Sequence, residues 1–171
     1  MIKKEVTKLL NEQINKELFS AYLYLEFVNY LTEKGLMGYA HWYRVQAQEE
    51  RDHAMLIYDF LHYHGAKVEL DAIDKPVLKA DSVMDVLKEG LKHEQFVTAS
   101  INNIYDLAKQ NKDFLTQRFL DWFINEQGEE EANANELILK NEMFGGDARS
   151  LYLLDQELMA RTYAPPSVQI G

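Results

Sequence analysis

The sequence has no cysteine in its 171 residues. This absence excludes disulfide bonds, iron–sulfur clusters, zinc sites built from thiolates and a thiol nucleophile. Any metal chemistry must therefore use histidine, glutamate and aspartate side chains. The length fits a single domain of ordinary size, which is long enough to bury a full core.

Positive charge is also scarce. Lysine and arginine total 18 against 28 aspartates and glutamates, which gives a formal net charge of -10. This balance argues against a nucleic acid or an anionic membrane as a partner, and it favours the binding of cations. No apolar run is long enough to cross a membrane, and the first residues, Met1–Val6, contain no apolar targeting segment. We therefore expect a soluble, cytoplasmic protein.

Apolar residues recur three or four positions apart through most of the chain, which is typical of amphipathic helices. Gly35 and Gly65 are natural helix ends, and Ser82 with Asp85 has the pattern of a capping box. The sequence predicts an all-α fold with one domain, 1–161, and a C-terminal tail, 162–171. The predicted helices are residues 4–33, 38–64, 83–110, 113–144 and 147–161.

The connection between the second and third predicted helices, residues 66–81, is longer than most helix-to-helix loops and contains Pro76. A connection of this length can return along a whole helix. Two short-linked hairpins would then be joined by one long crossover, with the second and third helices parallel. The sequence therefore predicts a four-helix bundle with one long crossover and a short fifth helix.

Polar residues interrupt the apolar face of each long predicted helix at its midpoint. These residues are Glu17, Glu50 and His53, Glu94, and Gln127 and Glu130. The first three recur 77 positions later as the last three, so the two hairpins would face each other across a pseudo-twofold axis. A buried glutamate without a partner costs several kcal/mol or stays protonated, so four in one bundle indicate a cation between them. The alternatives are glutamates that reach water at the edge of each face, and a solvated acidic run at residues 129–131.

Oxygen donors with one imidazole suit iron or manganese and tolerate zinc, whereas calcium would not recruit a histidine. Glu50 and His53 lie three residues apart on one helical face, so Glu50 can bridge two metals. The first metal would be bound by Glu17, Glu50 and His53, and the second by Glu50, Glu94 and Glu130. In the second hairpin the corresponding pair is Gln127 and Glu130, which lacks a nitrogen donor and one carboxylate. We expect the second metal to bind more weakly, so that metals pass through the site.

Combined motifs of the four helices resemble those of the bacterial non-haem ferritins over residues 1 to about 161. The motifs are Asn11-Glu12-Gln13 with Glu17 and Tyr24, Gln48-Glu49-Glu50 with His53, His93-Glu94-Gln95, and Trp122 followed by Glu126-Gln127 and Glu129-Glu130-Glu131. The resemblance implies a ferritin-like bundle that assembles into a hollow shell of 24 subunits. Such a shell would oxidise Fe(II) with dioxygen or hydrogen peroxide and store the ferric product as a mineral.

The resemblance also implies roles for individual residues. The two iron sites would use the ligand sets given above, with Gln127 as a hydrogen-bonding group in the second site. A third iron site would be formed by Glu49, Glu126, Glu129 and Glu130. Tyr24 would be the phenol of the centre, orienting a ligand or donating an electron.

Related classes differ at single positions. A haem-binding ferritin would place its methionine before the ligand motif of the second helix, whereas Met55 follows it, so we expect no haem and assign Met55 to packing. The runner-up function is a di-iron oxidase or oxygenase acting on another substrate, which would favour two symmetric Glu-x-x-His motifs. A metal-free structural bundle is a third possibility, distinguished by no stabilisation on adding metal. The remaining histidines are expected at the surface or at helix ends: His41, His62, His64 and His93.

Overall fold

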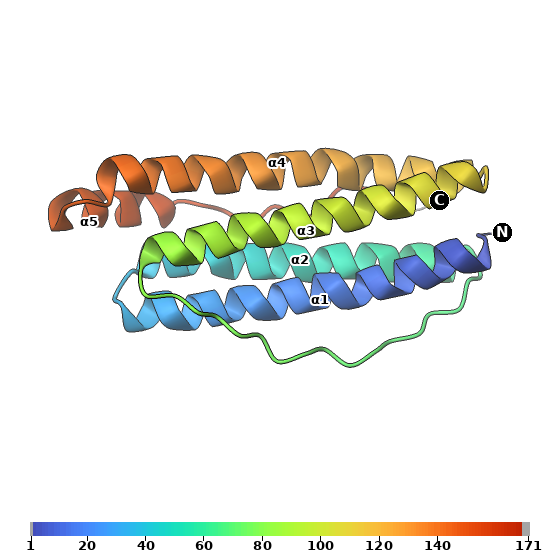
Figure 1. The fold of residues 1–171 in the computed structure, drawn as a ribbon, viewed down its shortest axis with the longest axis horizontal. Helices are drawn as coiled ribbons and strands as arrows, with labels where there is room; N and C mark the ends of the chain where they lie inside the picture. Colours follow the sequence, from blue (N-terminus) through green and yellow to red (C-terminus); the bar gives the residue numbers. More distant parts are fainter. Residues whose placement is uncertain (1, 169–171) are drawn as a thin grey trace.

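Five helices build the protein in a computed structural model that describes residues 2–168, and no strand occurs within that range. The helices are α1 (Lys4–Glu33), α2 (Met37–Tyr63), α3 (Val83–Gln110), α4 (Phe114–Phe144) and α5 (Ala148–Leu158). The first four form an elongated bundle (Figure 1). The predicted all-α fold with a short fifth helix is confirmed.

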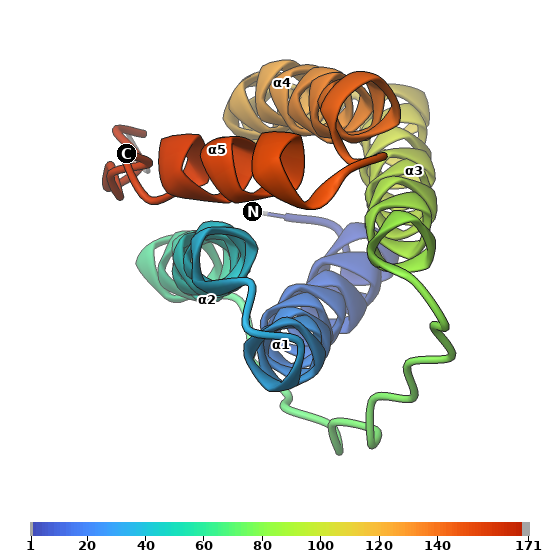
Figure 2. The same ribbon diagram turned by 90° about the vertical axis from the view of Figure 1, so that its left-hand side faces the viewer.

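The two hairpins, α1 with α2 and α3 with α4, pack tightly within themselves and meet mainly through α1 and α3. The crossover after α2 runs back along the bundle before α3 begins, so α2 and α3 point in the same direction (Figure 1). Viewed from the end, the four helices occupy the corners of a square, and α5 lies across that end (Figure 2). Since α5 contacts α2 and α4, it connects the two hairpins.

Helix ends follow the local chemistry of the sequence. Gly35 and Gly65 take the positive φ angles of 75° and 67° that end α1 and α2. Ser82 and Asp85 form a reciprocal capping box at the start of α3. The fifth helix is shorter than predicted, because it ends at Leu158 and not at residue 161. The following residues leave the helix and run back along α2.

Asp155 of α5 is buried and caps α2. Its Oδ1 accepts hydrogen bonds from the backbone N–H groups of Gly38, at 2.8 Å, and Tyr39, at 3.0 Å. The N-cap of α2, Leu36, has no side chain that could accept these bonds, so the distant carboxylate takes its place. The helices approach so closely that a Cβ on Gly38 would lie 1.6 Å from the carbonyl oxygen of Asp155. A glycine is therefore required at this contact.

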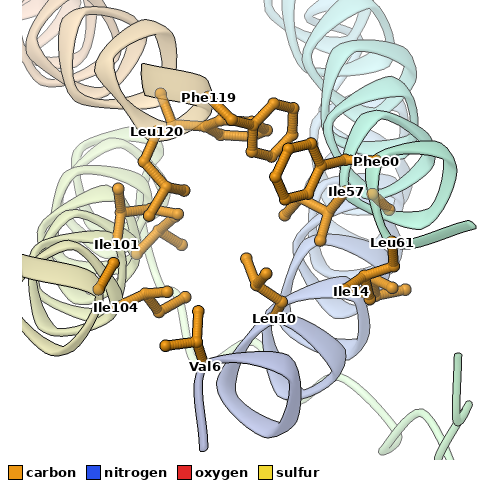
Figure 3. Packing of buried hydrophobic residues seen from close by; sticks show 14 residues of the cluster. Val6, Leu10, Ile14, Ile57, Phe60, Leu61, Ile101, Ile104, Phe119 and Leu120 are labelled. Atoms are coloured by element: carbon orange, nitrogen blue, oxygen red, sulfur yellow. The ribbon is translucent and has the colours of Figure 1, made fainter. Parts of the chain in front are cut away.

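Two apolar clusters fill the bundle, one toward each end. The first, drawn in Figure 3, takes residues from all four long helices and includes a stacked pair, Phe60 and Phe119, with ring centroids 4.0 Å apart. The second contains Tyr24, Phe27 and Leu137, together with Leu154 and residues of the other helices. In each long helix the polar midpoint residues fall between these two clusters. The burial of both clusters therefore holds the polar centre away from water.

Two apolar residues of the long helices lie at the surface. Leu25 is 43% exposed, and Met55, which was assigned to packing, is 38% exposed. Leu25 lines a shallow groove between α1 and α2 with Leu18, Tyr22 and Ile73. This part of α1 is apolar on its outer face as well as its inner face.

No helix among residues 2–168 combines the length and apolar character needed to cross a membrane.

Candidate metal centre

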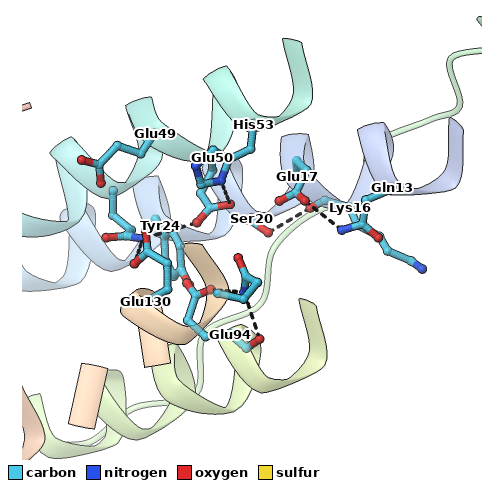
Figure 4. A network of polar contacts seen from close by, with 12 residues as sticks. Gln13, Lys16, Glu17, Ser20, Tyr24, Glu49, Glu50, His53, Glu94 and Glu130 are labelled. Carbon is cyan, nitrogen blue, oxygen red and sulfur yellow. Dashed lines mark hydrogen bonds and ion pairs between the residues drawn. The ribbon is translucent and has the colours of Figure 1, made fainter. Parts of the chain in front are cut away.

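The polar residues predicted at the helix midpoints meet in the middle of the bundle (Figure 4). They come from all four long helices, and none is more than 5% exposed. They are Glu17 and Tyr24 of α1, Glu50 and His53 of α2, Glu94 of α3, and Gln127 and Glu130 of α4. The alternative in which each glutamate reaches water at the edge of an apolar face is therefore excluded for these residues.

Glu17, Glu50 and His53 form the tightest group. One ligand atom from each lies within 4.8 Å of the others, and no other such group of three occurs among residues 2–168. The buried atoms Glu17 Oε2, Glu50 Oε2 and His53 Nδ1 have no hydrogen-bond donor or acceptor, although His53 Nδ1 lies 3.6 Å from Glu50 Oε2. Buried polar atoms are normally paired. Three neighbouring side chains that each keep a buried donor atom without a hydrogen bond fit a divalent cation, with the hard oxygen and imidazole set that iron, manganese or zinc accepts.

The carboxyl groups of the centre hold their protons more tightly than usual. Burial, followed by the nearby charge of Glu50, raises the pKa of Glu17 from 4.5 to about 8. Burial and the charge of Glu94 raise the pKa of Glu130 to about 8, and burial raises the pKa of Glu94 to about 7. The pKa of Glu50 is also raised, by burial and by the nearby charges of Glu94 and Glu130. A cation between these groups would displace their protons and favour the ionised forms.

Neutral donors hold the carboxylates of the predicted second site. Tyr24 donates its hydroxyl proton to Glu94 Oε1, and Gln127 Nε2 donates to Glu94 Oε2 at 3.2 Å. Gln46 Nε2 donates to Glu130 Oε2 at 2.6 Å and to Glu50 Oε1 at 3.4 Å. Burial and the charge of Glu94 raise the pKa of Tyr24, so this phenol stays protonated and remains a donor. These carboxylates therefore lie around the centre but do not form a second group as tight as the first.

Two glutamines to which the sequence analysis gave no role, Gln13 and Gln46, also act on the centre. Gln13 donates to Glu17 at 2.8 Å, just as Gln46 donates to Glu50. In both cases the glutamine precedes its glutamate by four residues, a spacing that places the two side chains on one helical face. This repeated four-residue spacing is the sequence signal from which both glutamines could have been predicted. Gln13 is itself fixed by Ser100, which donates to its Oε1 at 2.6 Å.

The residues of the expected third site are less closely gathered. Glu129 is exposed and Glu126 is half-buried. Glu49 forms an ion pair with Arg161, with Nη2 and Oε2 2.5 Å apart. Burial is the main cause of the raised pKa of Glu49 and also of Glu126. Arg161, the last residue of the predicted helix 147–161, was not expected to contact Glu49, and in the structure it lies three residues beyond the end of α5.

Aromatic and histidine rings surround the ligands. His93 was expected at the surface but is only 9% exposed, and its Nε2 lies 2.8 Å from Ser20 Oγ. Burial lowers the pKa of His93 to about 4, so its ring is neutral and packs edge-on against Tyr24. Trp122 of α4 packs edge-on against His53 with ring centroids 5.4 Å apart. These contacts fix the orientation of the phenol and of the imidazole ligand.

Gly128 lies in the middle of α4, between residues of the expected third site, and a Cβ there would meet no atom within 4 Å. Its backbone is helical, so glycine is not required by space or by conformation. We expect Gly128→Ala to stabilise the protein by about 1 kcal/mol, because alanine loses less backbone entropy in a helix. The melting temperature should rise by about 2–4 °C in calorimetry. Thr32→Ala, at the end of α1, is the control. A lower melting temperature of the Gly128→Ala variant would contradict the expected stabilisation.

A buried group of carboxylates and an imidazole inside a four-helix bundle with one long crossover is the arrangement of the ferritin-like carboxylate proteins. A family model for the ferritin-like domain matches residues 7–143. The chain belongs to this ferritin-like family. It is 37% identical over 163 residues to the bacterial non-haem ferritin of Staphylococcus epidermidis. The aligned region covers 95% of this chain and 98% of that protein.

Other relatives agree. The bacterial non-haem ferritin of Staphylococcus aureus is 36% identical with the same coverage. The engineered closed form of Archaeoglobus fulgidus ferritin is 41% identical and superimposes with a TM-score of 0.93, covering 96% of this chain and 100% of that one. The open-pore ferritin of the same archaeon gives a TM-score of 0.92 at 41% identity, over 95% of this chain and 100% of its own.

Proposed function

We infer that this protein stores iron and has ferroxidase activity, with Fe(II) as the substrate of the buried centre. The observation that carries this conclusion is the group of Glu17, Glu50 and His53, which is buried between two apolar clusters and in which each side chain keeps one donor atom without a hydrogen bond. These residues would bind the first Fe(II). Glu50 would bridge to a second Fe(II) bound by Glu94 and Glu130, with Gln127 as a neutral hydrogen-bonding group.

The chemistry of the centre suits oxidation of iron. Fe(III) is a harder ion than Fe(II), so a site rich in carboxylates stabilises the oxidised product. Two Fe(II) ions supply the two electrons that convert dioxygen and two protons into hydrogen peroxide, or hydrogen peroxide and two protons into water. The protonated carboxyl groups can release protons when iron binds, because their pKa values are raised. Tyr24 would orient a ligand through Glu94 or donate a further electron.

Oxidised iron must then leave the centre. We propose that it passes to a third site formed by Glu49, Glu126, Glu129 and Glu130, since Glu130 belongs to both sites. A neutral amide at residue 127, instead of a carboxylate, weakens binding at the second position and favours this transfer. The ion would then reach a cavity where ferric mineral is deposited.

Storage of mineral requires an assembly, and we propose a hollow shell of 24 subunits in the cytoplasm. Exposed apolar side chains in the groove between α1 and α2, including Tyr22 and Leu25, provide a surface that another subunit could cover. No nucleic acid or membrane partner is proposed, and no haem, because the acidic composition and the position of Met55 do not favour them.

The test is electron microscopy of the purified protein after anaerobic loading with Fe(II) and exposure to air. Hollow particles with dense cores are expected. A monomer or dimer in solution that turns over iron without forming cores would instead favour the di-iron oxidase or oxygenase alternative. A protein whose melting temperature is unchanged by Fe(II) or Zn(II) would favour the metal-free structural bundle.

Gln127→Glu should retain iron at the second position. The new carboxylate would add a charged ligand near Glu94, so the second Zn(II) should bind about tenfold more tightly in calorimetric titration. Ferric iron should leave the centre more slowly in stopped-flow absorbance. Asn125→Asp adds the same charge on the exposed face of α4 and should change neither quantity. Equal second-metal affinity in the Gln127→Glu variant and the unsubstituted protein would contradict the role given to Gln127.

A further inference from the structure

Arg161, three residues beyond the end of α5, reaches back to α2 and is largely buried. Its side chain is 13% exposed. The guanidinium stacks over the ring of Trp42 at 4.2 Å and donates through Nη1 to the Trp42 carbonyl at 3.2 Å. It also donates through Nη1 to Gln46 Oε1 at 2.8 Å and through Nη2 to Glu49 Oε2 at 2.5 Å. Such a set of contacts immobilises the charge.

The segment around Arg161 follows α2. The backbone carbonyl oxygen of Arg161 lies 2.8 Å from His41 Nε2, and two residues later the Tyr163 hydroxyl donates to Asp52. Figure 1 shows this segment, in red, returning along the bundle after α5. The backbone carbonyl of Arg161 and the hydroxyl of Tyr163 thus both hold this segment against α2.

The contact with Gln46 reaches the metal centre. Because Gln46 Oε1 accepts from Arg161, its NH2 group must face the other way, toward Glu130 at 2.6 Å and Glu50 at 3.4 Å. With the amide reversed, its carbonyl oxygen would face two carboxylates and its NH2 would face a guanidinium. Arg161 therefore fixes the orientation in which Gln46 holds Glu130.

The contact with Glu49 affects a different ligand. Glu49 is a ligand of the proposed third site, and its carboxylate is already neutralised by a fixed positive charge. An incoming metal ion must separate that charge from Glu49 or bind without this ligand. Like charges at such short range oppose each other strongly in a partly buried site.

We propose that Arg161 is a positioning residue that competes with iron for Glu49 and holds Glu130 through Gln46, so that the third ion binds only transiently. This inference rests on the proposed function, because it assumes that Glu49 and Glu130 receive iron after oxidation. The C-terminal segment would thereby favour onward movement of iron into mineral over its retention.

The experiment is a titration of the assembled, metal-free protein with Tb(III), followed by its luminescence, with assembly checked by size-exclusion chromatography. Arg161→Gln should bind the third ion about tenfold more tightly than the unsubstituted protein, which is the scale of one charge-assisted contact. The gain should disappear in the double variant Arg161→Gln with Glu49→Gln. Unchanged third-ion affinity in Arg161→Gln would overturn the proposal.

Two further variants separate competition by charge from loosening of the C-terminal segment. Arg161→Lys keeps the positive charge and should leave the third ion weakly bound. Tyr163→Phe removes the contact of the segment with Asp52 without touching Glu49, and it should bind like the unsubstituted protein. Tighter binding of the third ion in either variant would show that loosening the C-terminal segment is enough to strengthen binding. It would overturn the proposed competition between Arg161 and iron for Glu49.

Failure of this inference differs from failure of the proposed function. If Glu17→Gln leaves all Tb(III) and Zn(II) binding unchanged, the buried centre is not a metal site and the proposed function fails. If Glu17→Gln weakens the first ion but Arg161→Gln does not strengthen the third, only the role of Arg161 fails.

Discussion

Glu50→Ala should reduce the initial rate of Fe(II) oxidation by more than about 100-fold, beyond the loss usual for removing a group that only supports a ligand. Glu50 faces both halves of the centre: it belongs to the group with Glu17 and His53, and its pKa responds to Glu94 and Glu130. No other carboxylate on α2 is buried, so no neighbour can replace it. The measurement is stopped-flow absorbance of ferric product after anaerobic Fe(II) is mixed with air-saturated buffer.

Two controls accompany the Glu50 variant. Glu33→Ala removes an exposed carboxylate at the end of α1 and should oxidise iron at the unsubstituted rate. Glu50→Gln keeps the size of the side chain, so it separates loss of the ligand from a packing defect and should be nearly as slow as Glu50→Ala. Oxidation at the unsubstituted rate in both Glu50 variants would refute the proposed centre.

The second large effect concerns stability in the absence of metal. A carboxyl group whose pKa is higher in the folded protein binds more protons when folded than when unfolded. For Glu17, with a pKa raised from 4.5 to about 8, the free energy of unfolding is highest at or below pH 4.5 and falls as the pH rises to about 8. Glu130 and Glu94 act in the same direction. We expect these groups together to lower the free energy of unfolding by several kcal/mol between pH 5 and 8. Each tenfold difference in proton affinity between the folded and unfolded states corresponds to about 1.4 kcal/mol.

Differential scanning calorimetry of the metal-free protein at several pH values measures this effect. The melting temperature should fall by roughly 10 °C from pH 5 to pH 8, and Zn(II), which is redox-inactive, should reverse most of the fall by binding the ionised carboxylates. Glu17→Gln cannot ionise at this position and should show a flatter profile. The same slope in Glu17→Gln and the unsubstituted protein would contradict the assignment.

Much of the fold followed from local chemistry. The periodicity of apolar residues predicted the four long helices, and Gly35, Gly65 and the Ser82–Asp85 capping box predicted where three of their ends lie. These features act over a few residues, so they can be read without the tertiary structure. Predicting the all-α bundle with a long crossover needed one further observation, which was the length of the connection between the second and third helices.

The centre followed from the same periodicity. A carboxylate on an apolar face must be buried, and four such positions at the midpoints of four helices must meet if the helices pack side by side. Glu17, Glu50, His53, Glu94 and Glu130 could be named in this way. His93 could not, since its burial depends on how closely α1 and α3 approach, which periodicity does not give.

By itself, the sequence determined the helices, their order and the donors that face the interior, because spacing along one helix dictates which side chains share a face. The tertiary structure alone decided which distant residues cap α2 and which contact the residues around the site. Asp155 caps α2 from 117 residues away, and Arg161 reaches Gln46 and Glu49 from more than 110 residues away. These contacts arise where α5 and the irregular segment after it pack on α2, and no periodic pattern along one helix records such a contact because its geometry is set by packing.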